Sequence, residues 1–143
     1  DRAGSPAPHT ERRKTMKILR VEPEKSPEIV DMEGTLEALQ AAVGGYIEAV
    51  YPWDDPVAIV CNDDGKFNGM QPNRALYNED GEIMDIIAGT FLIVGLTDDN
   101  FGPLSDELAA KYAALFGTPE AFLRSGDRIL VFPMGPDPDT CPF

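Results

Sequence analysis

The sequence predicts one compact α+β domain, in which a mixed or mainly antiparallel sheet of about five strands packs against two main helices. Three observations support this fold class. The chain has 143 residues, of which 43% are hydrophobic, so it can bury one real core. Short β-favouring runs bounded by turn residues recur along residues 16–132, and only two segments place apolar residues at helical spacing.

The composition divides the chain into three parts. Residues 1–15 are rich in Pro, Ser, Arg and Thr without an apolar period, so we expect a disordered leader. Met16 resembles a natural start to which an upstream sequence was fused. The single domain is predicted to span residues 16–132, and the Pro-rich residues 133–143 should form a flexible tail.

The first strands are predicted near the start of the domain. In residues 18–22 successive side chains would alternate between two faces until Pro23 ends the run. Residues 27–31 should add a short edge strand. Residues 46–51 alternate as another strand, which Pro52 closes.

A first helix is predicted between these strands. Thr35 is a residue type that caps helix N-termini, and Gly44-Gly45 can adopt the left-handed conformation that ends a helix. Glu37 lies in the first turn, where a negative charge is favourable. The buried face is predicted to consist of Leu36, Leu39 and Val43.

The middle of the chain reads as further strands. Residues 57–61 form a continuous apolar run, which is typical of a strand covered on both faces. The turn residues 62–65 predict a hairpin at its end. Residues 69–76 show no clear period, whereas residues 83–96 form a long β-favouring stretch in which Gly89 predicts a bend or bulge.

A second helix is predicted to start at Ser105 and to end at Gly117, with two acidic residues at its positive end. A further short helical turn is predicted over residues 118–120, and a final strand over residues 128–132. The buried face of the second helix is predicted to consist of Leu108, Tyr112 and Leu115.

The charge is strongly acidic. The whole chain carries a net −13, and residues 1–15 carry four basic and two acidic side chains, so the remainder carries −15. Such a surface repels phosphate backbones, and direct binding to nucleic acid is not expected. A solvated acidic face is the favoured interpretation. The alternative is a surface that competes with nucleic acid for a basic partner.

The chain shows no apolar run long enough for a membrane span and no secretory pattern at its start, so we expect a cytoplasmic protein without membrane contact. Its single histidine, His9, lies in the predicted leader, and the domain therefore lacks a histidine base. Cys61 is predicted in a buried strand as a core residue, and Cys141 in the tail. We expect no enzymatic activity and no cofactor.

Two groups of residues are candidates for a binding site. Carboxylate and amide clusters occur at residues 54–55, 62–64, 78–80 and 98–100, but they lack the ligand spacing of a calcium loop and fit turns equally well, so no metal site is predicted. The polar segment around Arg74 is the second group. The candidate binding residues are Gln71, Asn73 and Arg74, with Tyr46 and Trp53 as aromatic surfaces for stacking.

Arg74 has two interpretations. It could clamp an anionic group or a partner carboxylate, because a guanidinium suits planar anions. It could equally form an intramolecular bridge to one of the many acids of the domain, which is the favoured interpretation. The aromatic candidates likewise fit ordinary packing as well as stacking.

Four ordered blocks carry a family resemblance: VGGYIEAVYP at 43–52, PVAIVCNDDGK at 56–66, PNRAL at 72–76 and DGEIMDIIAGTFLIVG at 80–95. In these blocks the chain resembles the bacterial and phage family called domain of unknown function 3846, from about Met16 to about Leu123. The resemblance implies a small accessory protein of a conjugative element, a phage or its host, often encoded near antirestriction genes. It implies no catalytic residue.

The sequence therefore favours a small acidic, non-enzymatic interaction protein of a mobile element, phage or bacterial host, with an unknown protein partner or a small anionic ligand. One alternative is an acidic DNA-mimicking antidefence factor, which would align its carboxylates at phosphate-like spacing. The other is a small-molecule or nucleotide-binding module built around Asn73 and Arg74, which would need a pocket with convergent donors beside that segment.

Overall fold

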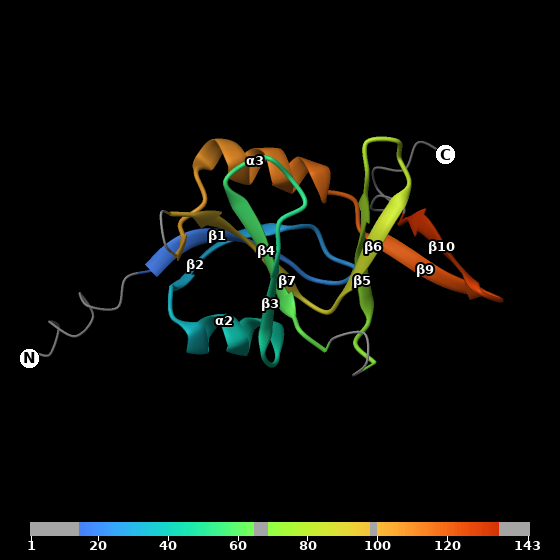
Figure 1. Ribbon diagram of the computed structural model, residues 1–143, viewed down its shortest axis with the longest axis horizontal. Coiled ribbons are helices and arrows are strands. Elements are labelled where there is room, and N and C mark those ends of the chain that lie inside the picture. Colours follow the sequence, from blue (N-terminus) through green and yellow to red (C-terminus); the bar gives the residue numbers. More distant parts are fainter. Residues whose placement is uncertain (1–14, 65–68, 98–99, 135–143) are drawn as a thin grey trace, which may run out of the picture.

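The computed structural model describes residues 15–64, 69–97 and 100–134. The predicted leader up to residue 14, the predicted tail from residue 135, which includes Cys141, and parts of the turns at 62–65 and 98–100 lie outside the described residues. Within them the chain folds as an α+β domain, as predicted, with antiparallel strand pairing throughout (Figure 1).

The main sheet has six strands, five of them in the order β2-β1-β7-β4-β3, and β8 pairs with β7. These strands are β1 (Thr15–Val21), β2 (Glu28–Glu33), β3 (Ile47–Val50), β4 (Val57–Asn62), β7 (Phe91–Leu96) and β8 (Phe101–Gly102). Two hairpins form separate two-stranded sheets, β5 (Pro72–Tyr77) with β6 (Ile83–Ala88), and β9 (Glu120–Ser125) with β10 (Arg128–Pro133). The helices are α2 (Leu36–Val43) and α3 (Asp106–Leu115).

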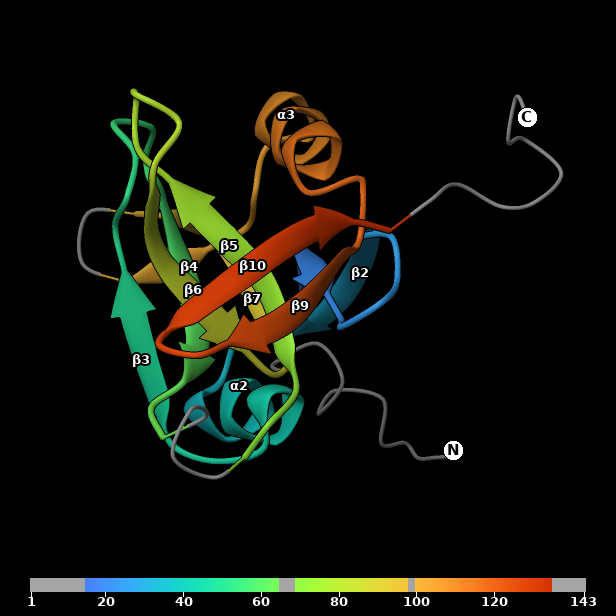
Figure 2. The same ribbon diagram turned by 90° about the vertical axis from the view of Figure 1, so that its right-hand side faces the viewer.

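The main sheet is covered on both faces. Odd-numbered apolar residues of β4 and β7 belong to one core, which includes side chains of α3 and of the β5–β6 hairpin, whereas even-numbered ones pack with α2 (Figures 1 and 2). All six residues of β4 are buried. The prediction that residues 57–61 form a strand covered on both faces is therefore confirmed, and the period of two places alternate side chains in two different cores.

Both helices start where their caps predict. The Thr35 Oγ1 accepts a hydrogen bond from the Ala38 N–H at 3.1 Å, and Gly44 ends α2 with φ +82°. The Ser105 Oγ accepts from the Leu108 N–H at 3.2 Å, although α3 ends at Leu115, before the predicted stop. Local capping chemistry thus defines these ends.

Two leucines predicted to be buried are exposed instead. Leu36 is the first residue of α2 and is exposed, whereas Leu39 and Val43, one turn apart, are buried. Leu115, at the end of α3, is 57% exposed. Both leucines are terminal residues of their helices. The predicted helical period is correct, but the period does not show how far along the helix the packing against the core extends.

Three predicted connections are corrected. The turn after β4 leads to no hairpin, because both edges of β4 already pair with β3 and β7, and β5 pairs with β6 instead. The predicted long strand over residues 83–96 is two strands in different sheets, since Gly89 with φ +79° redirects the chain. The helical turn predicted at 118–120 is the start of β9, where the Pro119 carbonyl accepts from the Met134 N–H.

Candidate functional site

The β3–β4 loop, the β5–β6 hairpin and α3 meet at one end of the domain (Figure 2). Side chains from these three parts line a concave surface. We call it the outer groove, and its volume is about 740 Å³. Its functional groups come from three separate parts of the sequence. They are Trp53, Asp54 and Asp55 from the loop, Tyr77, Glu79, Asp80 and Met84 from the hairpin, and Lys111, Tyr112 and Leu115 from the helix.

A second, smaller hollow adjoins the outer groove and shares Trp53, Tyr77 and Leu115 with it. We call it the inner pocket, and its volume is about 120 Å³. Its further lining includes Arg74, Leu76, Phe116 and Glu120. The two hollows together form one site with a wide charged part and a small, mainly apolar part.

The wall between the two hollows is aromatic. The Trp53 ring lies against the Tyr112 ring, with centroids 4.4 Å apart and planes 32° from parallel, and against the Phe116 ring at 6.0 Å. Phe116 in turn meets Phe91 of the core edge to face at 5.4 Å. Because aromatic pairs of this kind hold each other in place, Trp53 is a fixed surface although it lies on a loop.

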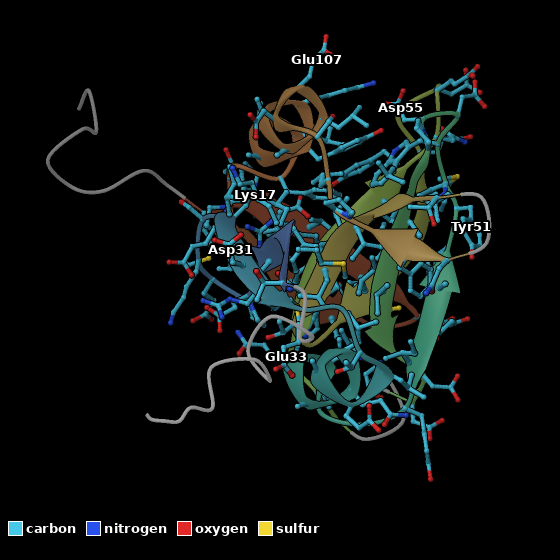
Figure 3. All side chains as sticks on the ribbon, turned by 90° about the vertical axis from the view of Figure 1, so that its left-hand side faces the viewer. Lys17, Asp31, Glu33, Tyr51, Asp55 and Glu107 are labelled. Carbon is cyan, nitrogen blue, oxygen red and sulfur yellow. The ribbon has the colours of Figure 1, made fainter. Side chains whose placement is uncertain are left out.

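Asp55 ties the loop to α3. Its Oδ2 accepts hydrogen bonds from the Lys111 Nζ and from the Tyr112 hydroxyl, both at 2.6 Å. Figure 3 shows Asp55 at the same end of the molecule as α3. The bond from Lys111, and then the bond from Tyr112, lower the pKa of Asp55, while burial and then the bond to Asp55 raise the pKa of Tyr112. At neutral pH Asp55 is therefore ionised and Tyr112 protonated.

This arrangement predicts a pH-dependent contribution to stability. A carboxyl whose pKa is lower in the folded state stabilises the fold above its ordinary pKa of 3.8, and the contribution disappears as the pH falls through the folded value. Asp55→Asn should therefore lower the melting temperature at about pH 6, and the difference from the unmodified protein should shrink towards about pH 2. Thermal unfolding across this range measures the effect.

The matched control is Asp54→Asn, because the Asp54 carboxylate makes no hydrogen bond or ion pair with a described residue. It should change the melting temperature little at either pH. A difference for Asp55→Asn that stays constant down to about pH 2 would contradict the assigned ionic contact.

Asn73 and Arg74 are inside the fold. Arg74 is only 1% exposed, and its guanidinium donates to the Phe116 carbonyl through Nε and Nη2, to the Lys25 carbonyl through Nη2, and to the Asn73 carbonyl and Oδ1 through Nη1. The Asn73 Nδ2 donates to the carbonyls of Val21 and Gly89 at 2.9 Å each. The intramolecular partners of Arg74 are thus backbone carbonyls and the Asn73 side-chain oxygen, not the expected carboxylate.

Burial lowers the pKa of Arg74, and the nearby Glu120 carboxylate opposes that effect. The guanidinium joins the end of α3, the β1–β2 connection and β5. Its Nε, Nη1 and Nη2 atoms all donate hydrogen bonds within the chain, so Arg74 contributes the shape of the inner pocket wall and not free hydrogen-bond donors.

The five candidate residues from the sequence lie in different places. Trp53 and Arg74 meet at the inner pocket, and Asn73 is buried directly beside it in the chain. Gln71 is exposed and donates from Nε2 to the Glu24 Oε2 at 2.7 Å. Tyr46 is 75% exposed and lines neither hollow. The binding role of these residues stays a prediction, and Trp53 is the one whose position fits it best.

Most of the groove was missed from the sequence. Asp55, Tyr77, Met84, Lys111 and Glu120 were not chosen as site residues, yet they line the two hollows. One signal was available: Trp53-Asp54-Asp55 and Tyr77-Asn78-Glu79-Asp80 are two turns in which acidic residues closely follow an aromatic residue. The preference of turns for Asp and Asn accounts for the acidic residues, but it does not account for an aromatic residue, Trp53 or Tyr77, in front of both turns.

In residues 15–64, 69–97 and 100–134, no three His, Cys, Asp or Glu side chains are grouped as metal ligands. Neither helix of this described part is long and apolar enough to cross a membrane. Cys61 is buried on β4 and donates from Sγ to the Glu48 carbonyl at 3.7 Å, as expected for a core cysteine.

The family described as Domain of unknown function (DUF3846) matches residues 16–117, from β1 to just past the end of α3. The chain belongs to this family. The DUF3846 match covers every wall of the outer groove, whereas Glu120 of the inner pocket lies beyond it, on the β9–β10 hairpin. No curated protein and no solved structure matches the chain.

Proposed function

We propose that this DUF3846 protein is a non-enzymatic interaction protein of a mobile element, phage or bacterial host, and that the outer groove is its contact surface for a protein partner. The observation that carries the proposal is the exposed apolar rim of the groove. Tyr77 of β5, Met84 of β6 and Leu115 of α3 all line it and are all exposed. Grouped apolar side chains around a concave surface mark protein contacts.

The size of the hollows supports a protein partner over a small ligand. Small-molecule sites usually enclose about 300–1,000 Å³. The less open part here, the inner pocket, has about 120 Å³, while the larger part is a more open groove. The convergent donors that a small anion would need beside Arg74 are already bonded to carbonyls.

The titration of the groove supports a role without catalysis. General acid–base catalysis works best when the pKa of the catalytic group lies near the working pH. Here the pKa of Asp55 is lowered, and those of Tyr77 and Tyr112 are raised, so all three move away from neutrality. The charges of these three groups therefore do not change near neutral pH, which suits a binding surface.

The proposal is tested by placing a charge on the rim. Met84→Asp should abolish capture of the partner from extracts of the native host, because Met84 is 50% exposed and an ionised side chain there opposes burial in an interface. Ile29→Asp is the matched control, since Ile29 is 53% exposed on β2 and lines neither hollow.

Affinity purification followed by mass spectrometry should show at least one protein that the unmodified chain and Ile29→Asp retain and Met84→Asp loses. Both variants should keep the melting temperature within a few degrees, as surface substitutions usually do. Equal retention of every partner by Met84→Asp would overturn the groove as the contact surface.

A further inference from the structure

The charge of the outer groove is one-sided. Four carboxylates line it, against the single ammonium group of Lys111, which is already bound to Asp55 at 2.6 Å. The three remaining carboxylates, of Asp54, Glu79 and Asp80, make no hydrogen bond or ion pair with a described residue. An approaching anion is repelled by this wall, and a cation is attracted.

Aromatic rings stand beside these carboxylates. Trp53 immediately precedes Asp54, and Tyr77 lies on the same hairpin as Glu79 and Asp80; both rings line the groove. Aromatic faces attract lysine and especially arginine side chains, and the planar guanidinium stacks on them. Carboxylates and aromatic rings together fit a cationic side chain better than carboxylates alone or rings alone.

The inner pocket has a different character. The Glu120 carboxylate is engaged on both oxygens, by the Ala75 N–H at 2.8 Å and by the Tyr77 hydroxyl at 3.2 Å. The guanidinium of Arg74 on the same wall repels a second cation. What remains available is the apolar lining of Leu76, Leu115 and Phe116, in a volume suited to one aliphatic side chain.

We infer that the groove recognises a basic segment of a protein partner, with an arginine or lysine side chain against Trp53, Tyr77 and the three unpaired carboxylates, and a nearby aliphatic side chain in the inner pocket. The inference rests on the proposed function, because it names the chemistry of the partner at the same site. Charge complementarity selects the cation, and the size of the inner pocket selects the aliphatic anchor.

The chain provides its own probe. Trp53 is the single tryptophan and lines both hollows, so its fluorescence reports occupancy of the site. A short synthetic peptide with arginines beside a leucine should change this fluorescence saturably. The same peptide with glutamate in place of arginine should not.

Charge-neutral variants separate the groove from the general acidity of the protein. The triple variant Asp54→Asn, Glu79→Gln and Asp80→Asn should weaken binding of the arginine peptide about tenfold, since each partly exposed ion pair contributes up to about 1 kcal/mol. The matched triple variant is Asp31→Asn, Glu37→Gln and Glu48→Gln, which removes as many exposed carboxylates outside both hollows. It should change binding by less than about twofold.

Asp31 lies on a different side of the molecule from Asp55 (Figure 3), so the control changes net charge without changing the groove. Equal weakening by both triple variants, or no saturable signal from Trp53, would overturn the inference. In that case the proposed function is still decided separately, by the loss or retention of the native partner in Met84→Asp.

The anchor is tested on the peptide. Replacing its leucine by serine should weaken binding roughly tenfold, because burial of a leucine side chain contributes about 1.5–3 kcal/mol. Unchanged affinity would overturn the assignment of the inner pocket. All protein variants should be compared at equal folded fraction, measured by circular dichroism.

Discussion

Replacing Arg74 by alanine should reduce the free energy of unfolding by about 3 kcal/mol or more, a large part of the stability of a typical domain. The truncation removes the donors to the buried Phe116 carbonyl and to the part-buried Lys25 carbonyl, and opens a cavity between α3 and β5. A buried acceptor without a partner costs about 1–3 kcal/mol, and the cavity adds to this. Chemical denaturation at neutral pH measures the loss.

Arg20→Ala is the matched control. Arg20 is a partly exposed arginine of β1, paired with Glu28 at 2.7 Å, and such surface pairs contribute about 1 kcal/mol or less. Arg74→Lys should recover little of the lost stability, because one ammonium group cannot replace a planar fork that reaches several carbonyls. A loss below about 1 kcal/mol for Arg74→Ala, with lost partner capture, would instead support the binding role.

Short-range features of the fold could be predicted because their causes are local. Thr35, Gly44 and Ser105 act within one helical turn of themselves, and their capping positions were predicted correctly. The apolar run of β4 indicated a strand covered on both faces without any knowledge of its neighbours. Each of these signals is contained in a few consecutive residues.

The environment of Arg74 could not be predicted in the same way. Its carbonyl partners at Phe116 and Lys25 are 42 and 49 residues away in the sequence. Backbone carbonyls are present at every residue, so no pattern of side chains marks which of them a guanidinium will reach. The sequence therefore left an anion clamp and an internal bridge as alternatives for Arg74. Only the fold shows that the Arg74 side chain lies in the interior.

The groove depends on a topological detail that the sequence also hides. Gly89 ends β6, so that β5 and β6 leave the main sheet and pair as a separate hairpin. This separation brings Tyr77 opposite Trp53 and α3, and creates both hollows. A single strand over residues 83–96 with a bend or bulge at Gly89, as predicted, would have kept the hairpin in the sheet and left no groove at this place.

Gly95→Ala should destabilise the protein by about 3 kcal/mol, although Gly95 lies in a regular strand where alanine is normally tolerated. A Cβ at this position would overlap the Pro103 carbonyl oxygen and lie 2.9 Å from the carbonyl carbon. These are backbone atoms, which cannot rotate away as a side chain can. Relief requires moving β8 and the following Leu104, whose N–H donates to the Lys17 carbonyl and whose side chain is in the core.

Gly34→Ala is the matched control, because the added Cβ would meet the flexible Met16 side chain at 3.3 Å and no backbone atom. It should cost less than about 1 kcal/mol in the same denaturation experiment. Nearly equal stability of the two variants would show that the Pro103 backbone can move away from β7 at little cost in free energy. A large loss confined to Gly95→Ala would show instead that the Pro103 backbone is held close against β7.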